Sequence, residues 1–324
     1  MIDNKFTLIS YLGKGGSSKV FLAKNEFGCK WAIKIIRKDK KYPTEIADKM
    51  LKREHKMLSL LKSHPNIIDS YGINLDGFAT MDDECEKVKY NVIEFAENGP
   101  LSNFIRYTGA IEEDISRLLI VQLWSAVEFM HLQGYAHLDI KLENILLDEF
   151  YNVKLADMGG SLWIKDSNGY VDRRRGTTLY MAPEVISFTP GDVYNALKAD
   201  IYSLGVAIFV MLIGEFPKPS DFSSNWVTNG SDETHISKSE WWSVSKKVKL
   251  RWKQLSKEIQ QLIWSMIHSD PDQRPSISDV LAFSWLSRDI PLSMINEIYN
   301  EMFWRKQVMT RIFREEDCIL QHAE

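Results

Sequence analysis

A short loop, "AHLDIKLENIL" at residues 136–146, carries three side chains suited to phosphate chemistry. Asp139 can accept a proton, Lys141 is a cation and Asn144 is an amide, at spacings of two and three residues. Carboxylate and amide oxygens are ligands that Mg²⁺ accepts, and an ammonium group can neutralise a phosphoryl oxygen. The loop therefore predicts a site that handles a phosphate and a metal ion, although the apolar Leu138 lies in the middle of it.

A glycine-rich stretch, "LGKGGSSKV" at residues 12–20, offers a second phosphate-binding candidate. Gly13, Gly15 and Gly16 have no Cβ atom, so backbone amides there can approach phosphate oxygens closely. A simple glycine-rich hairpin turn is the alternative, and this stretch alone does not decide between the two.

Lys34 lies in the strand-like run "CKWAIKII" and shares strand parity with Ala32 and Ile36, which modestly favours the buried face. A buried ammonium group needs a carboxylate partner. Glu54 is the expected partner, because it lies on the apolar stripe of the helical pattern that follows. The alternative is that Lys34 is an exposed member of the basic run 30–41.

Asp157, in "KLADMGG", follows a short apolar strand and precedes two glycines, a position suited to a carboxylate that reaches a metal ion. A common Asp-x-Gly turn is the alternative. Downstream, Glu184 in "GTTLYMAPE" and Arg274 in "DPDQRPS" can form a buried ion pair between two loops. Two separate surface charges would be the plain reading of that pair.

The hydrophobic pattern predicts the elements that position these residues. Residues 6–36 alternate β-type runs and turns, as in an antiparallel meander, and residues 44–62 have helical spacing. Two further strands are expected near 68–74 and 88–95, followed by a hinge at "ENGP". Helical spacing then dominates, at 112–133, 197–213 and 256–268. A small β-rich part therefore precedes a larger α-rich part.

Two more segments are predicted from composition and spacing. The polar stretch 217–248, with Trp241 and Trp242 near its end, is expected to be a surface loop. After Pro291 an amphipathic helix is expected, with its apolar stripe formed by Ile295, Ile298, Met302, Met309 and Ile312.

Composition limits the classes of function. A net charge of −4 over 324 residues argues against a nucleic-acid binder, and no run reaches eighteen uninterrupted apolar residues, so we expect no membrane insertion and a cytoplasmic location. Cys29, Cys85 and Cys318 lack the spacing of a zinc site or a disulfide framework. The oligomeric state is not predicted.

The order of the motifs is more informative than any one of them. A glycine-rich turn, strand lysine, helix glutamate, hinge, Asp139 with Asn144, Asp157 and then "APE" resembles a eukaryotic protein kinase from about Phe6 to Leu286. The resemblance implies an α+β bilobal protein-kinase-like fold over residues 6–290, with an antiparallel β-sheet N-lobe (about 6–94), a hinge (about 94–99) and an α-helical C-lobe (about 100–290). Residues 291–324 are then a C-terminal helical extension.

The resemblance also implies ATP and Mg²⁺ as ligands and protein Ser/Thr hydroxyls as acceptors, because Lys141 and Thr177 match the Ser/Thr-directed branch. Lys34, positioned by Glu54, would hold the α- and β-phosphates, Asp139 would accept or orient the hydroxyl proton, and Lys141 would neutralise the transferred phosphoryl group. Asn144 and Asp157 would hold Mg²⁺, and Asp200 would bond the backbone of the catalytic loop. The implied nucleotide-binding residues are Leu12, Gly13, Lys14, Gly15, Gly16, Ser17, Ser18, Val20, Ala32, Lys34, Glu94, Ala96 and Leu146.

Three residues depart from the family pattern. Ser18 stands where a third glycine often lies, and Met158 replaces the usual Phe, whose internal slot a flexible Met can fill. Leu138 replaces the Arg whose charge a phosphorylated activation loop usually neutralises. We therefore expect activity that does not depend on activation-loop phosphorylation.

Two alternatives remain open from the sequence. One is a catalytically inactive pseudokinase scaffold, which the presence of Lys34, Asp139 and Asp157 disfavours. The other concerns the final helix, which either packs on the C-lobe or binds a regulatory partner as calmodulin targets do, through Arg305, Lys306, Arg311 and Arg314 around its apolar stripe.

Overall fold

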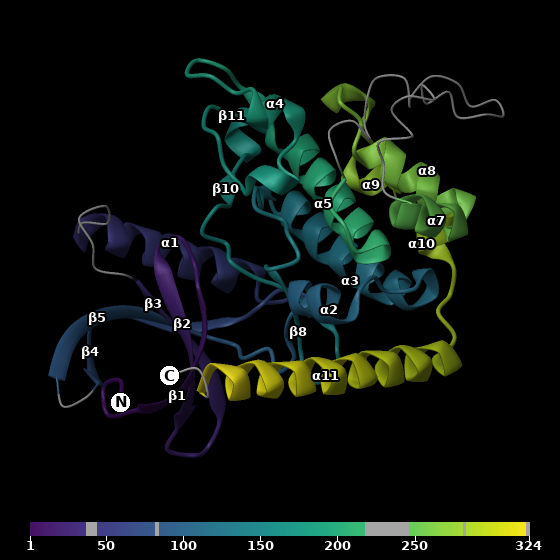
Figure 1. Ribbon diagram of the computed structural model, residues 1–324. Helices are drawn as coiled ribbons and strands as arrows, with labels where there is room; N and C mark the ends of the chain where they lie inside the picture. Colours follow the sequence, from purple (N-terminus) through teal and green to yellow (C-terminus); the bar gives the residue numbers. More distant parts are fainter. Residues whose placement is uncertain (37–43, 82–83, 218–245, 281–282, 322–324) are drawn as a thin grey trace. The chain divides into compact units, whose positions relative to one another are not determined.

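The computed structural model describes residues 1–36, 44–81, 84–217, 246–280 and 283–321 (Figure 1). Its contacts divide the chain into two compact units. The first unit consists of Met1–Glu97 and Ala156–Gly159, and the second of Asn98–Leu155 and Gly160–Glu324. The polar stretch with Trp241 and Trp242, predicted as a surface loop over 217–248, lies outside the described residues apart from its two ends. At its carboxyl end the prediction is wrong, because residues 246–248 already belong to a helix.

A five-stranded antiparallel sheet in the order β1-β2-β3-β5-β4 forms most of the first unit. Its strands are β1 (Phe6–Lys14), β2 (Ser18–Asn25), β3 (Lys30–Ile36), β4 (Ser70–Met81) and β5 (Glu84–Ile93). The predicted meander over residues 6–36 is confirmed. β4 continues beyond its predicted end at residue 74, because the turn-forming residues in "NLDGF" lie within the strand, where the pairing with β5 shifts register between Asn74 and Gly77. β5 begins before the predicted residue 88 and ends at Ile93, two residues before the predicted end.

The first residues of the chain close one side of this sheet. Ile2 bridges to both Phe6 and Ala79, and the backbones of Met1 and Thr80 exchange hydrogen bonds. Ile2 is fully buried in a cluster with Ile33 and other apolar residues of the sheet, so the segment before β1 is part of the core.

Helix α1 (Thr44–Leu61) lies in the first unit and confirms the predicted helix over residues 44–62. Its apolar stripe of Ala47, Leu51, Leu58 and Leu61 is buried. Glu54 lies on the same stripe and is buried with it. The helix therefore presents a carboxylate from its packed side.

The second unit is mainly helical. Its longer helices are α2 (Leu101–Thr108), α3 (Glu113–Leu132), α5 (Ala196–Ile213), α7 (Lys246–Gln254), α8 (Lys257–Met266) and α11 (Leu292–Gln321). Single-turn helices are α4 (Pro183–Ile186), α9 (Ile277–Val280) and α10 (Ser284–Ser287), with 3-10 turns at Lys165–Ser167, Thr178–Tyr180 and Pro271–Gln273. Three of the predicted helices, 112–133, 197–213 and 256–268, correspond to α3, α5 and α8.

Short strands in the second unit support its loops. β6 (Gly99–Pro100), β8 (Ile145–Leu147) and β9 (Val153–Leu155) form a three-stranded sheet. β7 (Tyr135–Ala136) pairs with β10 (Leu162–Trp163), and β11 (Tyr170–Val171) pairs with β12 (Tyr194–Asn195). Because β7 and β8 flank "HLDIKLEN", both ends of that loop are fixed.

α5 is the central helix of the second unit and is apolar nearly all round, as expected of a buried helix. Asn195 caps its amino end by accepting hydrogen bonds from the backbone N–H groups of Leu197 and Lys198. Within the described residues, α3 and α5 are long and apolar enough to cross a membrane, but 50% and 83% of their apolar windows are buried inside the protein, as in core helices.

α11 confirms the predicted final helix, and it packs against α2 and α3 (Figure 1). Ile298, Met302 and Met309 of the predicted stripe are buried, and Arg305 is buried among them. Ile295, also assigned to that stripe, is 39% exposed, so that part of the prediction is wrong. The packed side of α11 begins one turn later, at Ile298.

Candidate functional site

The glycine-rich stretch forms the hairpin between β1 and β2. The backbone N–H of Gly15 donates to the carbonyl of Ser18 at 2.9 Å, and the Ser18 side chain is buried against this turn. The candidate residues follow the hairpin in order: Leu12, Gly13 and Lys14 in β1, Gly15, Gly16 and Ser17 in the turn, and Ser18 and Val20 in β2.

The expected pairing of Lys34 with Glu54 is confirmed. The Lys34 ammonium donates to Glu54 Oε1 at 2.6 Å and to Asp157 Oδ1 at 2.8 Å. Lys34 and Glu54 are both buried, so the alternative of an exposed Lys34 is wrong. Burial alone would lower the pKa of Lys34, but the two carboxylates outweigh it and hold the pKa above its ordinary value. Lys34 is therefore a permanent cation at neutral pH.

The strand register places further candidates on the face of the sheet that carries Lys34. Val20 lies opposite Lys34 in the β2–β3 pair, and Ala32 lies opposite Ile93 in the β3–β5 pair. Directly opposed residues and residues two apart project from the same face. Val20, Ala32 and Lys34 therefore share one face.

Glu94 and Ala96 follow β5 directly. The backbone N–H of Glu94 donates to the carbonyl of Asp69 at 2.9 Å, and the Glu94 carboxylate accepts from the backbone N–H of Asp69 at 3.1 Å. Ala96 is buried. Leu146, the remaining nucleotide candidate, lies in β8 of the second unit.

The structure brings the polar residues of the opening loop together around Asp139. The Lys141 ammonium donates to Asp139 Oδ2 at 2.7 Å and to the Thr177 hydroxyl at 2.8 Å, while that hydroxyl donates to Asp139 Oδ1 at 2.8 Å. Asn144 donates through Nδ2 to the carbonyl of Asp139 at 2.9 Å. These bonds leave Asn144 Oδ1, the oxygen suited to a metal, out of the contact with Asp139.

Asp200 of α5 holds the loop that carries these groups, as expected. Its fully buried carboxylate accepts from the backbone N–H groups of His137 and Leu138, each at 2.7 Å, and lies 2.9 Å from Nε2 of His131. Hydrogen bonds to a charged acceptor are among the stronger ones in proteins. They fix the backbone immediately before Asp139.

Leu138 is not a defect in this loop. Its side chain is buried, and it lines a small cavity together with Met181, Ala182 and Val185. Its backbone has a φ of 62°, which is uncommon for a branched side chain. The carbonyl of Leu138 lies next to Gly176, where an added Cβ would come within 2.8 Å of it. An apolar side chain thus packs where the family usually has a cation.

Met158 fills an internal position, as predicted from its flexibility: it is 1% exposed. The segment Ala156–Gly159 belongs to the first unit, so Asp157 is grouped with Lys34 and Glu54. Asp157 has a φ of 63° and a side chain that is 41% exposed. Its carboxylate thus contacts Lys34 and is still accessible to solvent.

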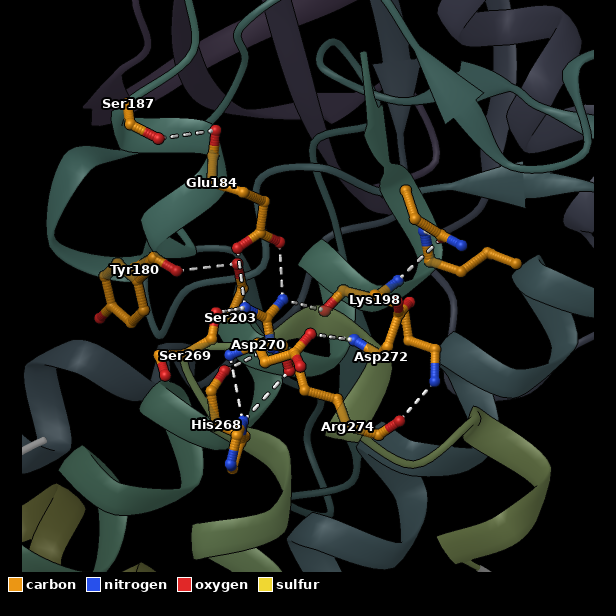
Figure 2. Close-up of polar contacts among 12 residues, drawn as sticks. Tyr180, Glu184, Ser187, Lys198, Ser203, His268, Ser269, Asp270, Asp272 and Arg274 are labelled. Atoms are coloured by element: carbon orange, nitrogen blue, oxygen red, sulfur yellow. Dashed lines mark hydrogen bonds and ion pairs between the residues drawn. The ribbon is translucent and has the colours of Figure 1, made fainter. Parts of the chain in front are cut away.

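The predicted ion pair between Glu184 and Arg274 is confirmed, and Figure 2 shows it within a dense polar cluster. Two guanidinium nitrogens donate to the two carboxylate oxygens, each at 2.7 Å. The same guanidinium donates to the carbonyls of His268, Lys198 and Ser269, so this buried cation has its N–H groups paired. It fixes the carboxyl end of the segment that begins at Thr177.

Sequence reasoning missed the role of Tyr180 in the same segment. The Tyr180 hydroxyl accepts from the backbone N–H of Leu142 at 3.3 Å and donates to Glu143 at 3.4 Å, while the Ser203 hydroxyl donates to its carbonyl. In the sequence, this contact was indicated only by the presence of both "LYMAPE" and the loop "AHLDIKLENIL". Residues 177–184 are thus tied to the loop of Asp139 at two points.

The alternatives for the final helix are also separated by contacts. The Arg305 guanidinium donates to the carbonyls of Thr108, Gly109 and Ala110, at the end of α2 and just after it, and Lys306 donates to the carbonyl of Asn98. Packing on the helical unit is therefore confirmed. A partner that binds the same stripe would have to displace these contacts.

Metal candidates are divided between the units. Asn144 lies in the second unit and Asp157 in the first. Among the residues that the structure describes, no group of three or more His, Cys, Asp or Glu side chains could hold a metal ion. The donor types at Asn144 and Asp157, an amide oxygen and a carboxylate, are nevertheless those that Mg²⁺ binds together with phosphate oxygens.

Comparison with known proteins gives the family. The protein kinase domain model matches residues 6–286. The testis-specific serine/threonine-protein kinase 2 of Mus musculus is 34% identical over 87% of this chain and 74% of its own length. The CBL-interacting serine/threonine-protein kinase 7 of Arabidopsis thaliana is 32% identical over 89% of this chain and 62% of its own length. The ovarian-specific serine/threonine-protein kinase Lok of Drosophila melanogaster is 34% identical over 90% of this chain and 58% of its own length. The chain therefore belongs to the protein kinase family, and its relatives are serine/threonine-protein kinases.

Proposed function

We propose that this protein transfers the γ-phosphoryl group of ATP to serine or threonine hydroxyls of protein substrates. The observation that carries the proposal is the triangle formed by Asp139, Lys141 and Thr177, in which a carboxylate, an ammonium group and a hydroxyl lie within 2.8 Å of one another in hydrogen-bonded pairs. A carboxylate so placed can take the proton of an incoming hydroxyl, and the adjacent ammonium group can neutralise phosphoryl oxygens.

The chain's own residues have separable tasks in this proposal. Asp139 orients the acceptor hydroxyl and receives its proton. Lys34, kept charged by Glu54 and Asp157, binds the α- and β-phosphates. Asn144 and Asp157 would hold Mg²⁺, which neutralises charge on the phosphates when bound.

The segment from Thr177 to Glu184 is the proposed place for the substrate peptide. It is fixed at Thr177 by Asp139, at Tyr180 by the loop of Asp139, and at Glu184 by Arg274. A rigid segment next to the proton acceptor can present a peptide hydroxyl in a constant geometry, which is a large part of catalysis by positioning. Thr177, rather than a residue specific to tyrosine acceptors, supports the serine/threonine assignment.

We also propose that phosphorylation of the loop 157–184 is not required for activity. The support is Leu138, whose buried apolar side chain stands in place of the arginine that a loop phosphate neutralises in kinases that carry it. In the loop that carries Asp139, the backbone is instead fixed by Asp200 and the Asp139 carboxylate by the Thr177 hydroxyl.

Transfer of labelled γ-phosphate to a generic basic protein tests the main proposal, with Asp139→Asn as the matched control. Asn keeps the shape of the side chain but does not accept the proton, so we expect transfer to fall by about 10²-fold or more. Equal transfer by both proteins would contradict catalysis and favour the scaffold alternative. A peptide array would then define the sequence around the acceptor.

A further inference from the structure

A second polar contact joins α1 to the sheet beside the ion pair of Lys34 and Glu54. His55 follows Glu54 in α1, and its Nδ1 lies 2.7 Å from the hydroxyl of Ser70 at the start of β4. The Ser70 hydroxyl donates to Oδ1 of Asn91 in β5 at 2.6 Å. We call His55, Ser70 and Asn91 the polar triad of the first unit.

Hydrogen counting gives the direction of this triad. The single hydrogen of the Ser70 hydroxyl is used on Asn91, so the oxygen must accept from Nδ1–H of His55. The helix therefore donates and the sheet accepts. Ser70 is the central member, because its hydroxyl takes part in both hydrogen bonds.

Burial makes the triad unusual for a purely structural contact. Ser70 is 4% exposed and Asn91 is fully buried, yet Nδ2 of Asn91 has no hydrogen-bond partner among the residues that the structure describes. A buried polar group without a partner lowers stability compared with an apolar side chain of similar shape. Packing alone therefore does not favour Asn at position 91. The residue is better explained by a role in holding the Ser70 hydroxyl in place.

The triad reaches the site through the strand register. Asn91 lies directly opposite Lys34 in the β3–β5 pair, so both side chains project from the same face of the sheet. Glu54 contacts Lys34 of β3, whereas His55 contacts Ser70 of β4. Successive residues of a helix are about 100° apart, so these two contacts hold α1 from two directions.

The buried apolar stripe of α1 sets its rotation only approximately, because apolar contacts are not directional, so polar contacts are needed to fix it. The pair of Asp48 with Lys89 of β5 restrains α1 two turns earlier, on the same side of the helix as His55. Next to Glu54 in the chain, the His55–Ser70 bond adds a polar contact to β4. Loss of it would let the Glu54 carboxylate move relative to Lys34.

We infer that the polar triad positions the Lys34–Glu54 pair, by fixing the rotation of α1 so that the Glu54 carboxylate faces Lys34. The inference rests on the proposed function, because Lys34 is there the group that binds the phosphates of ATP. His55, Ser70 and Asn91 are positioning residues, since they act through Glu54 and are not among the nucleotide-binding candidates.

Ser70→Ala is the test, because it removes the central hydroxyl with the smallest change in volume. The matched control is Ser59→Ala, on the exposed side of the same helix, where the hydroxyl donates only to the carbonyl of His55. Ser70→Thr keeps a hydroxyl and should rescue. We expect Ser70→Ala to lower kcat/KM for ATP by about five- to tenfold, from the loss of one buried hydrogen bond, with both other variants within about twofold of wild type.

The same substitutions in a Glu54→Gln background separate positioning from general destabilisation. If the triad acts through Glu54, Ser70→Ala changes kcat/KM by less than about twofold once Glu54 is altered, because the two effects are not additive. All rates are measured below the unfolding transition of every variant. An equal loss in both backgrounds, or no difference between Ser70→Ala and Ser59→Ala, would overturn the inference.

Binding of a fluorescent ATP analogue with Mg²⁺ gives a readout that needs no catalysis. We expect Ser70→Ala to weaken binding by about fivefold relative to Ser59→Ala. A wild type that binds the analogue but transfers no phosphate overturns the proposed function, and the comparison of affinities still decides the role of the triad. Equal affinities of the two variants, with an active wild type, overturn the triad alone.

Discussion

The hydroxyl of Thr177 donates to Oδ1 of Asp139 at 2.8 Å and accepts from Lys141 at the same distance. One hydroxyl therefore joins the proposed peptide segment to both the proton acceptor and its cation. Thr177→Val keeps the shape of the side chain and removes both bonds. We expect kcat to fall by roughly tenfold or more, because the carboxylate loses a fixed orientation, while KM for ATP changes little.

Thr177→Ser is the control for that prediction, since it retains the hydroxyl and should keep kcat within about threefold of wild type. The measurement is steady-state transfer to a peptide with a single acceptor. A Val variant as active as the Ser variant would show that the bond seen in the structure does not orient Asp139.

Gly176 precedes Thr177 and approaches the loop of Asp139 through its backbone. It has a φ of +108°, and a Cβ there would lie 2.8 Å from the carbonyl of Leu138. Gly176→Ala must therefore displace the segment that carries Thr177. We expect kcat to fall at least as far as in Thr177→Val.

Gly191→Ala separates this overlap from backbone strain. Gly191 has a similar φ of +103°, but no atom of the described part of the chain lies within 4 Å of its ideal Cβ. Both substitutions incur a cost of about 1 kcal/mol for the left-handed backbone, and only Gly176→Ala adds the overlap. Equal kcat values for the two variants would count against the close approach.

Leu138 leads to a prediction about control. Phosphatase treatment of the purified protein should leave the rate of transfer unchanged, because position 138 carries leucine and not the arginine that a loop phosphate neutralises in related kinases. Leu138→Arg provides the contrast. It places a cation at a site where Leu138 is only 5% exposed, and without a counter-charge we expect lower activity that phosphorylation of the loop restores.

Mass spectrometry shows whether the loop carries phosphate before phosphatase treatment and verifies that it carries none afterwards. Complete loss of wild-type activity on treatment would contradict the prediction. So would a Leu138→Arg variant that is as active as wild type in both states.

The fold class and the charged residues of the site were predictable because their signals are local. Strand alternation up to Ile36, helical spacing around Glu54 and the apolar runs of α3 and α5 each identify an element within a short window. The pairings of Lys34 with Glu54 and of Glu184 with Arg274 followed from the rule that buried charges are paired.

Contacts between distant segments were less predictable. Nothing around Arg305 indicates that its guanidinium binds the end of α2, about two hundred residues earlier, and the eight-residue α2 itself was not predicted. Ser70 and Asn91 read as ordinary polar strand residues until the β3–β5 register places Asn91 opposite Lys34. Hydrogen-bond partners of this kind depend on tertiary packing, which a single sequence does not encode locally.

The lowered pKa of Asp3 leads to a prediction of how the stability of the first unit changes with pH. Burial raises the pKa of its carboxyl. Hydrogen bonds from the Tyr90 hydroxyl, the backbone N–H of Phe78 and the Asn74 amide together lower it by more than burial raises it, so the pKa lies below its ordinary value. Stability gained from a lowered pKa is present above the unfolded value of about 3.9 and is lost as the pH falls through the folded value.

Asp3→Ala should therefore unfold at lower urea than wild type at pH 7, and the difference should shrink as the pH falls below about 4. Tyr90→Phe removes one of the donors and should give a smaller difference of the same sign. The measurement is urea unfolding followed by fluorescence from pH 7 to the acid limit of folding. A difference between Asp3→Ala and wild type that stays constant with pH would contradict the assignment.

From the contacts that Arg305 makes at the end of α2, we predict that α11 is needed for the second unit to remain folded. Arg305 is 6% exposed, and its guanidinium donates to the carbonyls of residues 108–110, to the Thr108 hydroxyl and to Glu301. Arg305→Gln leaves the last carbonyls of α2 without a charged donor, and we expect a loss of roughly 2–4 kcal/mol in the free energy of unfolding.

Arg311→Gln is the matched control, because Arg311 lies on the exposed side of the same helix and should change the free energy of unfolding by less than about 0.5 kcal/mol. Deletion of residues 291–324 should lower solubility together with activity, because it exposes the apolar surface of α2 and α3 that Ile298, Met302 and Met309 cover. A deletion variant that is soluble and more active than the full chain would instead mean that α11 restrains the enzyme. An Arg305→Gln variant as stable as Arg311→Gln would mean that the bonds of Arg305 to α2 contribute nothing measurable to stability.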